Sequence, residues 1–169
     1  WDDVFPADGS FSHPRFRLGV NSVAIAGRDL KRLIAPQKLT PAAANASIVG
    51  LSGKLKSLQH RLKAVSTESR VRATSRQFAQ IGLCGAFACV MAAEQVYSED
   101  YATMARFVSL NLPDVEPSLN LLVQMSEQGT SSSLEALAIS DDVMSWLPDF
   151  AEGWLDAHNP KRDETLKLV

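Results

Sequence analysis

The sequence of 169 residues is poor in cysteine and in aromatic residues, which make up 7% of it. Its two cysteines, Cys84 and Cys89, stand five residues apart in one apolar segment. As helical residues they point to nearly opposite sides, so they cannot form a disulfide with each other. We interpret them as small buried residues. Nothing indicates an oxidising environment, and we expect a soluble protein of a reducing compartment such as the cytoplasm.

Motifs of enzymes and of metal sites are also missing. The three histidines are scattered, and neither cysteine has a histidine at the spacing of a zinc site. Residues 50–54 (GLSGK) are similar to the end of a phosphate-binding P-loop. However, Ile48 stands where the first glycine belongs, and Leu55 stands where Ser or Thr would meet magnesium. We therefore expect no metal, no cofactor and no catalytic residue, and favour a non-enzymatic protein.

The N-terminal half has few acidic residues. Residues 1–80 contain thirteen Lys/Arg and five Asp/Glu, a net charge of +8, and residues 81–169 contain four and fourteen, a net charge of −10. Three interpretations are open. The halves neutralise each other inside one fold, both are solvated faces, or the division provides a surface that binds phosphates or assembles head to tail.

No segment has the pattern of a central strand, and apolar residues recur at helical spacing. We expect an all-α fold, a single-domain bundle of six to eight helices. With 46% hydrophobic residues, the chain is long enough to bury a core. The expected organisation is an N-terminal arm at 1–20, a helical core domain at 21–160 and a C-terminal tail at 161–169.

A heptad seam is the clearest periodic pattern, and it predicts one helix at 41–65. Its apolar residues repeat at spacings of four and three: Ala44, Ile48, Leu51, Leu55, Leu58, Leu62 and Val65. Such a seam is typical of a helix packed inside a bundle. Gly50 and Gly53 lie off the seam and weaken the helix by about 1 kcal/mol each.

The uncharged run at 81–93 predicts a second central helix at 70–97, buried on nearly all sides. The run is too short to cross a bilayer, so we expect no membrane insertion. Small residues follow one side of this helix and predict the close approach of a second helix: Gly82, Gly85, Ala86, Cys89 and Ala93.

Cap and breaker residues mark the remaining helices. We expect these at 22–35, from Ser98 to Pro113, from Pro117 to Gly129, and in three short segments that begin at Ser132, Ser140 and Pro148. Ser132 followed by Glu135 is typical of a capping box, in which side chains bond the backbone at the helix start.

Seven cations fall within 23 residues around the turn between the two central helices: Lys54, Lys56, Arg61, Lys63, Arg70, Arg72 and Arg76. Glu68 is the only acid among them. In a helical hairpin these cations flank one junction, which suits phosphate groups bound without base readout. No aromatic residue for base stacking occurs at 54–76, which argues against sequence-specific recognition. The alternative is a solvated face partly neutralised by the acidic half.

Arg76-Gln77-Phe78 resembles a motif at the start of a core helix in the coat proteins of flexible filamentous plant viruses. That family also has a Phe-containing segment ending in an acidic residue, here 107–114 (FVSLNLPD). The resemblance implies an all-α core with arms that join subunits around RNA, and a place in a virion. It implies that Arg76 is a phosphate-pocket arginine and Asp114 its acidic partner. The family's aromatic-acidic block is replaced here by 109–113 (SLNLP).

The N-terminal arm carries three aromatic anchors, Phe5, Phe11 and Phe16, which either fold on their own core or contact a neighbouring subunit. We expect a structural protein that self-associates into a homo-oligomer and binds nucleic-acid backbone, as a nucleocapsid or coat subunit does. Its partner is then single-stranded nucleic acid, bound without sequence specificity. The alternative is an all-α adaptor or scaffold subunit, docked in a larger complex through its arm and its basic surface. Its partner is then an acidic protein surface.

Overall fold

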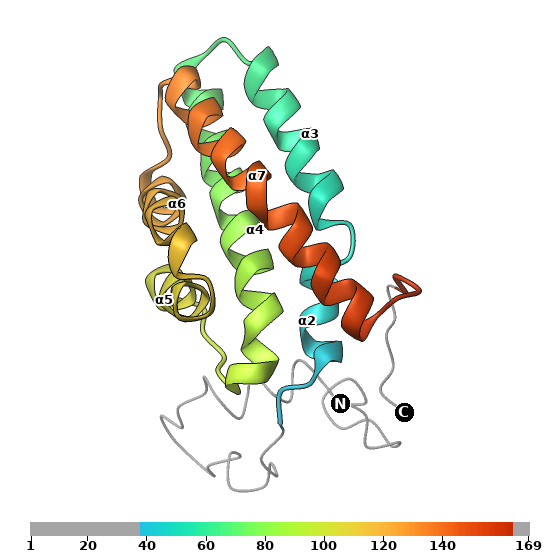
Figure 1. Ribbon diagram of the computed structural model, residues 1–169. Helices are drawn as coiled ribbons and strands as arrows, with labels where there is room; N and C mark the ends of the chain where they lie inside the picture. Colours follow the sequence, from blue (N-terminus) through green and yellow to red (C-terminus); the bar gives the residue numbers. More distant parts are fainter. Residues whose placement is uncertain (1–37, 164–169) are drawn as a thin grey trace, which may run out of the picture.

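The computed structural model describes residues 38–163 (Figure 1). The arm with its three phenylalanines, the helix expected at 22–35 and residues 164–169 lie outside this range. Residues 38–163 form helices and no strand, which confirms the all-α class. The elements are α2 (Pro41–Ile48), α3 (Leu51–Ala64), α4 (Glu68–Glu94), α5 (Tyr101–Asn111), the short 3-10 helix η2 (Pro113–Val115), α6 (Glu116–Gln128) and α7 (Ser133–His158).

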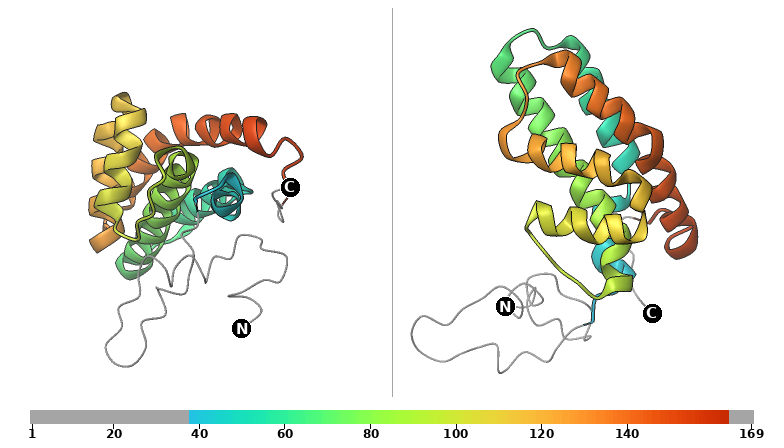
Figure 2. Two further views of the ribbon diagram at one scale, coloured as in Figure 1. Left: turned by 90° about the horizontal axis from the view of Figure 1, so that it is seen from below. Right: turned by 60° about the vertical axis from the view of Figure 1, so that its left-hand side comes forward.

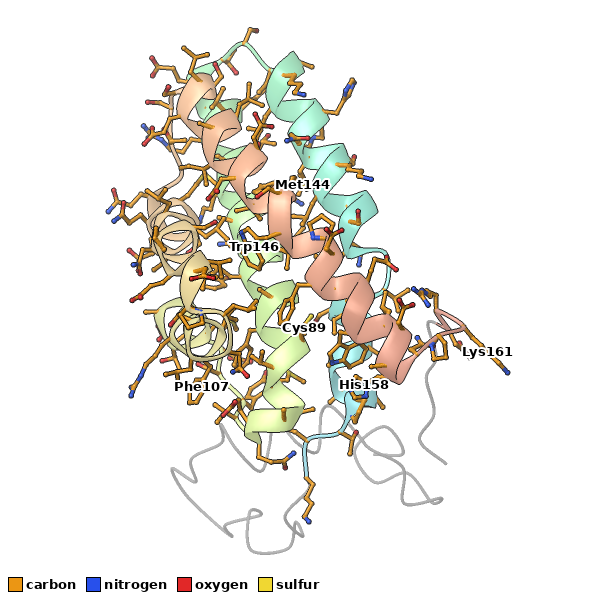
Figure 3. All side chains as sticks on the ribbon, in the orientation of Figure 1. Cys89, Phe107, Met144, Trp146, His158 and Lys161 are labelled. Atoms are coloured by element: carbon orange, nitrogen blue, oxygen red, sulfur yellow. The ribbon has the colours of Figure 1, made fainter. Side chains whose placement is uncertain are left out.

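Helix α4 lies at the centre and contacts α2, α3, α5, α6 and α7. Helices α3 and α4 form an antiparallel hairpin, and α7 crosses in front of α4 beside α3 (Figure 1). Helices α5 and α6 pack together and cross α4 on its other side, as the second view of Figure 2 shows. Trp146 of α7, labelled in Figure 3, reaches α6 and donates from Nε1 to Ser118 Oγ at 3.2 Å.

The length and composition of α4 suffice for a membrane-spanning helix, since it has 27 residues and a stretch with a mean hydropathy of 1.3. However, 61% of this stretch is buried inside the bundle. Phe78, Leu83 and Ala86 are completely buried there. Packing against the surrounding helices therefore accounts for the apolar character of α4.

The heptad seam is buried from Ala44 to Leu62, which confirms its prediction, and Val65 is half-buried. The expectation of one continuous helix at 41–65 is wrong, because the chain breaks between α2 and α3 at Gly50. Gly50 has φ 71° and ψ 9°, a left-handed conformation that glycine adopts without steric cost. The backbone N–H of Val49 donates to the carbonyl of Asn45 at 2.9 Å and closes α2.

The small residues of α4 do receive neighbours. Gly85 lies against Leu51 of α3, and Gly82 faces Leu122 of α6. Leucine side chains of α3 and α6 fill the space beside these small residues. The sequence pattern predicted that the backbone of a second helix would lie there.

Residues 130–163 contain one long helix instead of the three short ones predicted. Helix α7 runs for 26 residues and has Pro148 in its interior. Proline in a helix costs about 3 kcal/mol because it lacks the backbone donor. The buried stripe of Val143, Leu147 and Ala151 continues through it, and this burial outweighs the local cost.

Capping signals at the other helix starts are partly confirmed. The Ser132 hydroxyl accepts from the backbone N–H of Glu135 at 3.2 Å, which is one of the two bonds of a capping box. The second bond is absent, because the Ser132 N–H donates to the Thr130 hydroxyl oxygen and the Glu135 carboxylate accepts from the same hydroxyl. Helix α5 is capped by Asp100 and not by Ser98, because the Asp100 carboxylate accepts from Thr103 N at 2.8 Å. Hydrogen bonding from the Thr103 side chain, and then from its backbone N–H, lowers the pKa of Asp100.

Both ends of the described chain lie at the end of the bundle opposite the α3–α4 turn (Figure 1). Asn45 Nδ2 donates to the carbonyl of Asp163 at 2.8 Å. Arg162 forms ion pairs with Glu152 at 2.8 Å and Asp156 at 2.5 Å. Residues 161–163, expected to belong to the tail, are therefore held against α2 and α7.

Candidate anion-binding surface

An open groove of about 630 Å³ follows the first half of α4. Its lining residues are Ser69, Arg72, Ala73, Arg76, Gln77, Gln80 and Gln128. All but the last come from α4 at spacings of three and four residues, so they share one face of the helix. The lining contains two arginines and three amides but no carboxylate. Such a groove is suited to an anion.

Arg76 is fixed at the edge of this groove by the end of α6. Its Nε donates to the carbonyl of Ser126 at 3.0 Å, and Gln80 Nε2 donates to the same oxygen at 3.3 Å. Carbonyl groups at the end of a helix carry partial negative charge and favour a cation. The two terminal nitrogens of Arg76 have no hydrogen bond or ion pair to residues 38–163. One guanidinium nitrogen, Nε, therefore holds the Arg76 side chain in place, and the two terminal nitrogens can donate hydrogen bonds to a ligand.

Arg72 is covered on its backbone side by the loop after α6. A Cβ on Gly129 would lie 2.5 Å from the Arg72 carbonyl oxygen, so only glycine fits there. The Ser75 hydroxyl donates to the same carbonyl at 3.0 Å and accepts from Thr130 N at 3.0 Å. These contacts dock the 129–132 loop on α4 and fix one wall of the groove.

Two further arginines border the groove on the α3 side. Arg61 Nη1 donates to Gln77 Oε1 at 3.5 Å, which joins α3 to the groove. Arg70 stands seven residues before Gln77, so both lie on the same side of α4. Arg61, Arg70, Arg72 and Arg76 are all exposed, and we call them the arginine surface.

The structure divides the seven predicted cations between two surfaces. Lys54 stands seven residues before Arg61 and continues its line on α3 towards the α2 end. Lys56 and Lys63 share a different line with Gln59, whose Nε2 donates to Asp141 Oδ1 of α7 at 2.7 Å. The Lys56–Lys63 line therefore lies on the side of α3 next to α7, away from the groove.

Ion pairs do not neutralise these cations within the described part of the chain. The ion pairs of residues 38–163 join Arg162 to Glu152 and Asp156. None of the seven predicted cations contacts a carboxylate of this range, and all seven are exposed. Neutralisation of the basic half by the acidic half inside one fold thus receives no support in residues 38–163. Solvated faces and a surface that binds a partner are both compatible with these exposed cations.

Asp114 does not lie beside Arg76, although the coat-protein resemblance implies that they are partners. Arg76 contacts Ser126 near the end of α6, and Asp114 is exposed in η2 just before α6 begins. At 1.5 Å per helical residue, the two positions are separated by on the order of 15 Å. No ion pair joins them, because the length of α6 lies between them.

Other reactive groups in residues 38–163 are buried or dispersed. No cluster of three or more His, Cys, Asp or Glu residues that could hold a metal occurs there. Cys89 is buried and donates from Sγ to the carbonyl of Gly85 at 3.4 Å. Burial raises the pKa of Cys89 to about 12 and also raises the pKa of the half-buried Cys84. Neither thiol is therefore an activated nucleophile.

Comparisons with known proteins add no relative. No protein-family model, no curated protein and no solved structure matches this chain. The resemblance of Arg76-Gln77-Phe78 to the coat-protein motif stays a prediction.

Proposed function

We propose that the protein is a non-enzymatic structural protein that binds the backbone of single-stranded nucleic acid and self-associates. The supporting observation is the arginine surface: Arg72 and Arg76 line an open groove, Arg61 and Arg70 lie on its α3 side, and none of the four has a carboxylate partner in residues 38–163. Guanidinium groups bind phosphate oxygens through paired hydrogen bonds. Phosphates spaced along a strand would therefore be held by several of these arginines at once.

The composition of the groove favours backbone contacts over base recognition. From Ser69 to Gln80 the groove extends about 16 Å along α4, enough for on the order of four nucleotides at 3.4 Å or more each. Its lining has no aromatic side chain on which a base could stack. The amides of Gln77, Gln80 and Gln128 can bond sugar or phosphate oxygens of any sequence.

Self-association is the second part of the proposal. The basic first half and the acidic second half can meet head to tail between copies, and such heterologous contacts form rings or filaments. The N-terminal arm is proposed to contact a neighbour through Phe5, Phe11 and Phe16. The described part of the chain begins at the end of the bundle away from the α3–α4 turn (Figure 1). Removal of residues 1–15 should leave the helical content unchanged and abolish higher oligomers in sedimentation velocity.

Fluorescence anisotropy with a labelled single-stranded RNA of mixed sequence tests the nucleic-acid part. If four arginines contact phosphates, the logarithm of the affinity should fall with the logarithm of salt concentration with a slope of about −3. The affinity should then drop about 50-fold between about 50 and 200 mM salt. Equal affinity for RNAs of different sequence is also expected. Failure to bind RNA at the lower salt concentration would overturn this part.

A second candidate function is an adaptor that docks in a larger complex through its basic surface. Exposed apolar side chains on α5 and α7 support it, since Leu110 is 64% and Leu134 is 82% exposed. An adaptor of this kind would bind an acidic polypeptide. Binding of polyglutamate without binding of RNA at low salt would favour the adaptor.

A further inference from the structure

The outer face of α7 is acidic over its whole length. The helix has six acidic residues and no Lys or Arg: Glu135, Asp141, Asp142, Asp149, Glu152 and Asp156. Four of these stand seven residues apart and form one line along the helix: Glu135, Asp142, Asp149 and Asp156. This acidic line is exposed and about 32 Å long.

Within residues 38–163, contacts occupy only the two ends of the acidic line. The Glu135 carboxylate accepts from the Thr130 hydroxyl, and Asp156 pairs with Arg162. The carboxylates of Asp142 and Asp149 have no hydrogen bond or ion pair to residues 38–163. The contact with Arg162 shows that a cation fits against this face, and the middle of the face has no partner in the described chain.

Helix α3 carries the complementary pattern. It contains four Lys/Arg and no acidic residue. Lys56 and Lys63 stand seven residues apart, are exposed, and have no carboxylate partner in residues 38–163. Asp142 and Asp149 have the same spacing, so both pairs of charges repeat at about 10.5 Å along their helices. Two such helices laid side by side bring both pairs into register.

The two lines do not meet within one molecule, although α3 and α7 are in contact. Gln59 occupies the seam between the helices and donates to Asp141 and, at 3.5 Å, to the Ser140 hydroxyl. Lys56 and Lys63 stand beside this seam on the solvent side, and Asp142 and Asp149 face outward on α7. Each line is therefore open to another molecule.

We propose that the acidic line of α7 docks on the Lys56–Lys63 line of α3 in a second copy of this chain. The inference rests on the self-association in the proposed function and names the surfaces that carry it. The two surfaces differ, so the contact is heterologous and repeats from copy to copy. It leaves the arginine surface free for nucleic acid, because the Lys56–Lys63 line lies on the other side of α3. Exposed ion pairs are individually weak and screened by salt, so assembly needs several at once and weakens as salt rises.

Charge reversal tests this contact. One variant carries Asp142→Lys and Asp149→Lys, and a second carries Lys56→Glu and Lys63→Glu. Each variant alone should lose self-association in sedimentation velocity at about 50 mM salt, where charges are poorly screened. An equimolar mixture should assemble again, because every contact between unlike variants joins opposite charges. A chain with all four reversals should assemble by itself.

Matched controls separate this inference from the proposed function. Lys54→Glu with Arg61→Glu makes the same charge change on the other line of α3 and should keep self-association. Circular dichroism checks that each variant is folded, and RNA anisotropy is measured on all of them. If the two reversal variants assemble like the unmodified protein, or their mixture stays dissociated, the inference is overturned while RNA binding still supports the proposed function. If the unmodified protein does not self-associate at low salt, the proposed self-association is overturned as well.

Discussion

Leu51 at the start of α3 fills the space that a larger residue at position 85 of α4 would need. A Cβ on Gly85 would lie 2.7 Å from Leu51 Cδ1 and 3.1 Å from Leu51 Cγ. Both residues are buried, and Leu51 is 1% exposed, so the leucine has little room to move. The position of α3 on α4, and with it Arg61 beside the groove, depends on this glycine.

Gly85→Ala should therefore destabilise the protein by about 1–3 kcal/mol, because the overlap outweighs the better helix propensity of alanine. Gly82 is the matched control, since a Cβ there would meet Leu122 Cδ1 at 3.6 Å, an ordinary contact. Gly82→Ala should be neutral or stabilising by up to about 1 kcal/mol. Urea unfolding measures both variants, and equal free energies of unfolding would contradict the packing described.

Gly129→Ala should be destabilising for a different reason. Gly129 has φ 66° and ψ 172°, a conformation found almost only in glycine, and its Cβ would overlap the Arg72 carbonyl. We expect a loss of about 1–3 kcal/mol. Gly153→Ala, in the interior of α7 where a Cβ meets open space, should gain about 0.5–1 kcal/mol. A Gly129→Ala variant as stable as the unmodified protein would show that the loop does not dock on α4.

Cys89 should make stability fall at alkaline pH. Burial raises its pKa to about 12 from an ordinary value of 9.0. Between these values the unfolded chain releases a proton that the folded protein keeps. The free energy of unfolding therefore falls as pH rises, by at most about 1.4 kcal/mol per pH unit, and this group has no effect at lower pH.

The Cys89→Ala variant separates the effect of Cys89 on the free energy of unfolding from the effects of other groups that titrate at alkaline pH. Unfolding by urea is followed at about pH 8 and pH 11, and the two proteins are compared by the change between these values. The unmodified protein should lose more stability than the variant. Parallel losses would mean that the Cys89 thiolate is tolerated in the fold.

Local patterns predicted the core better than the helix ends. The heptad seam identified Leu55, Leu58 and Leu62 as buried because helical periodicity depends only on neighbouring residues. The break at Gly50 was not predictable in this way, since glycine accepts helical and left-handed backbone alike. Long-range packing, such as Leu51 on Gly85, selects the observed conformation.

Local start signals were misleading in α7. Ser140 precedes two acidic residues and Pro148 is favoured in a first helical turn, so both resembled helix starts. In the structure Ser140 is buried and its hydroxyl donates to the carbonyl of Leu137 at 2.9 Å. Burial of a continuous stripe outweighed both signals.

The residue types of the candidate site were predicted, but their grouping was not. Lys54 with Arg61 and Lys56 with Lys63 are each seven residues apart and so form two lines on α3, but this spacing does not show which line faces α4. The bond from Arg76 to Ser126 joins positions 50 residues apart, and no local pattern marks it. Gln80 and Gln128, which line the groove, were missed because neutral amides carry no charge signal.

The salt dependence of RNA binding by an arginine variant tests most directly whether the arginine surface binds the nucleic-acid backbone. In the triple variant Arg70→Gln, Arg72→Gln and Arg76→Gln, the slope of the logarithm of RNA affinity against the logarithm of salt concentration should be less negative by about 2 units. The double variant Arg70→Gln and Arg72→Gln keeps the Arg76 contact with α6. Its slope should be less negative by about 1.4 units.

A control variant with Lys56→Gln, Lys63→Gln and Lys161→Gln removes the same number of charges outside the arginine surface. Its slope should stay within about 0.5 units of that of the unmodified protein. This difference between the two triple variants is the result predicted for a backbone-binding groove on α4. Equal slopes in both triple variants would contradict it, because binding would then depend on net charge alone.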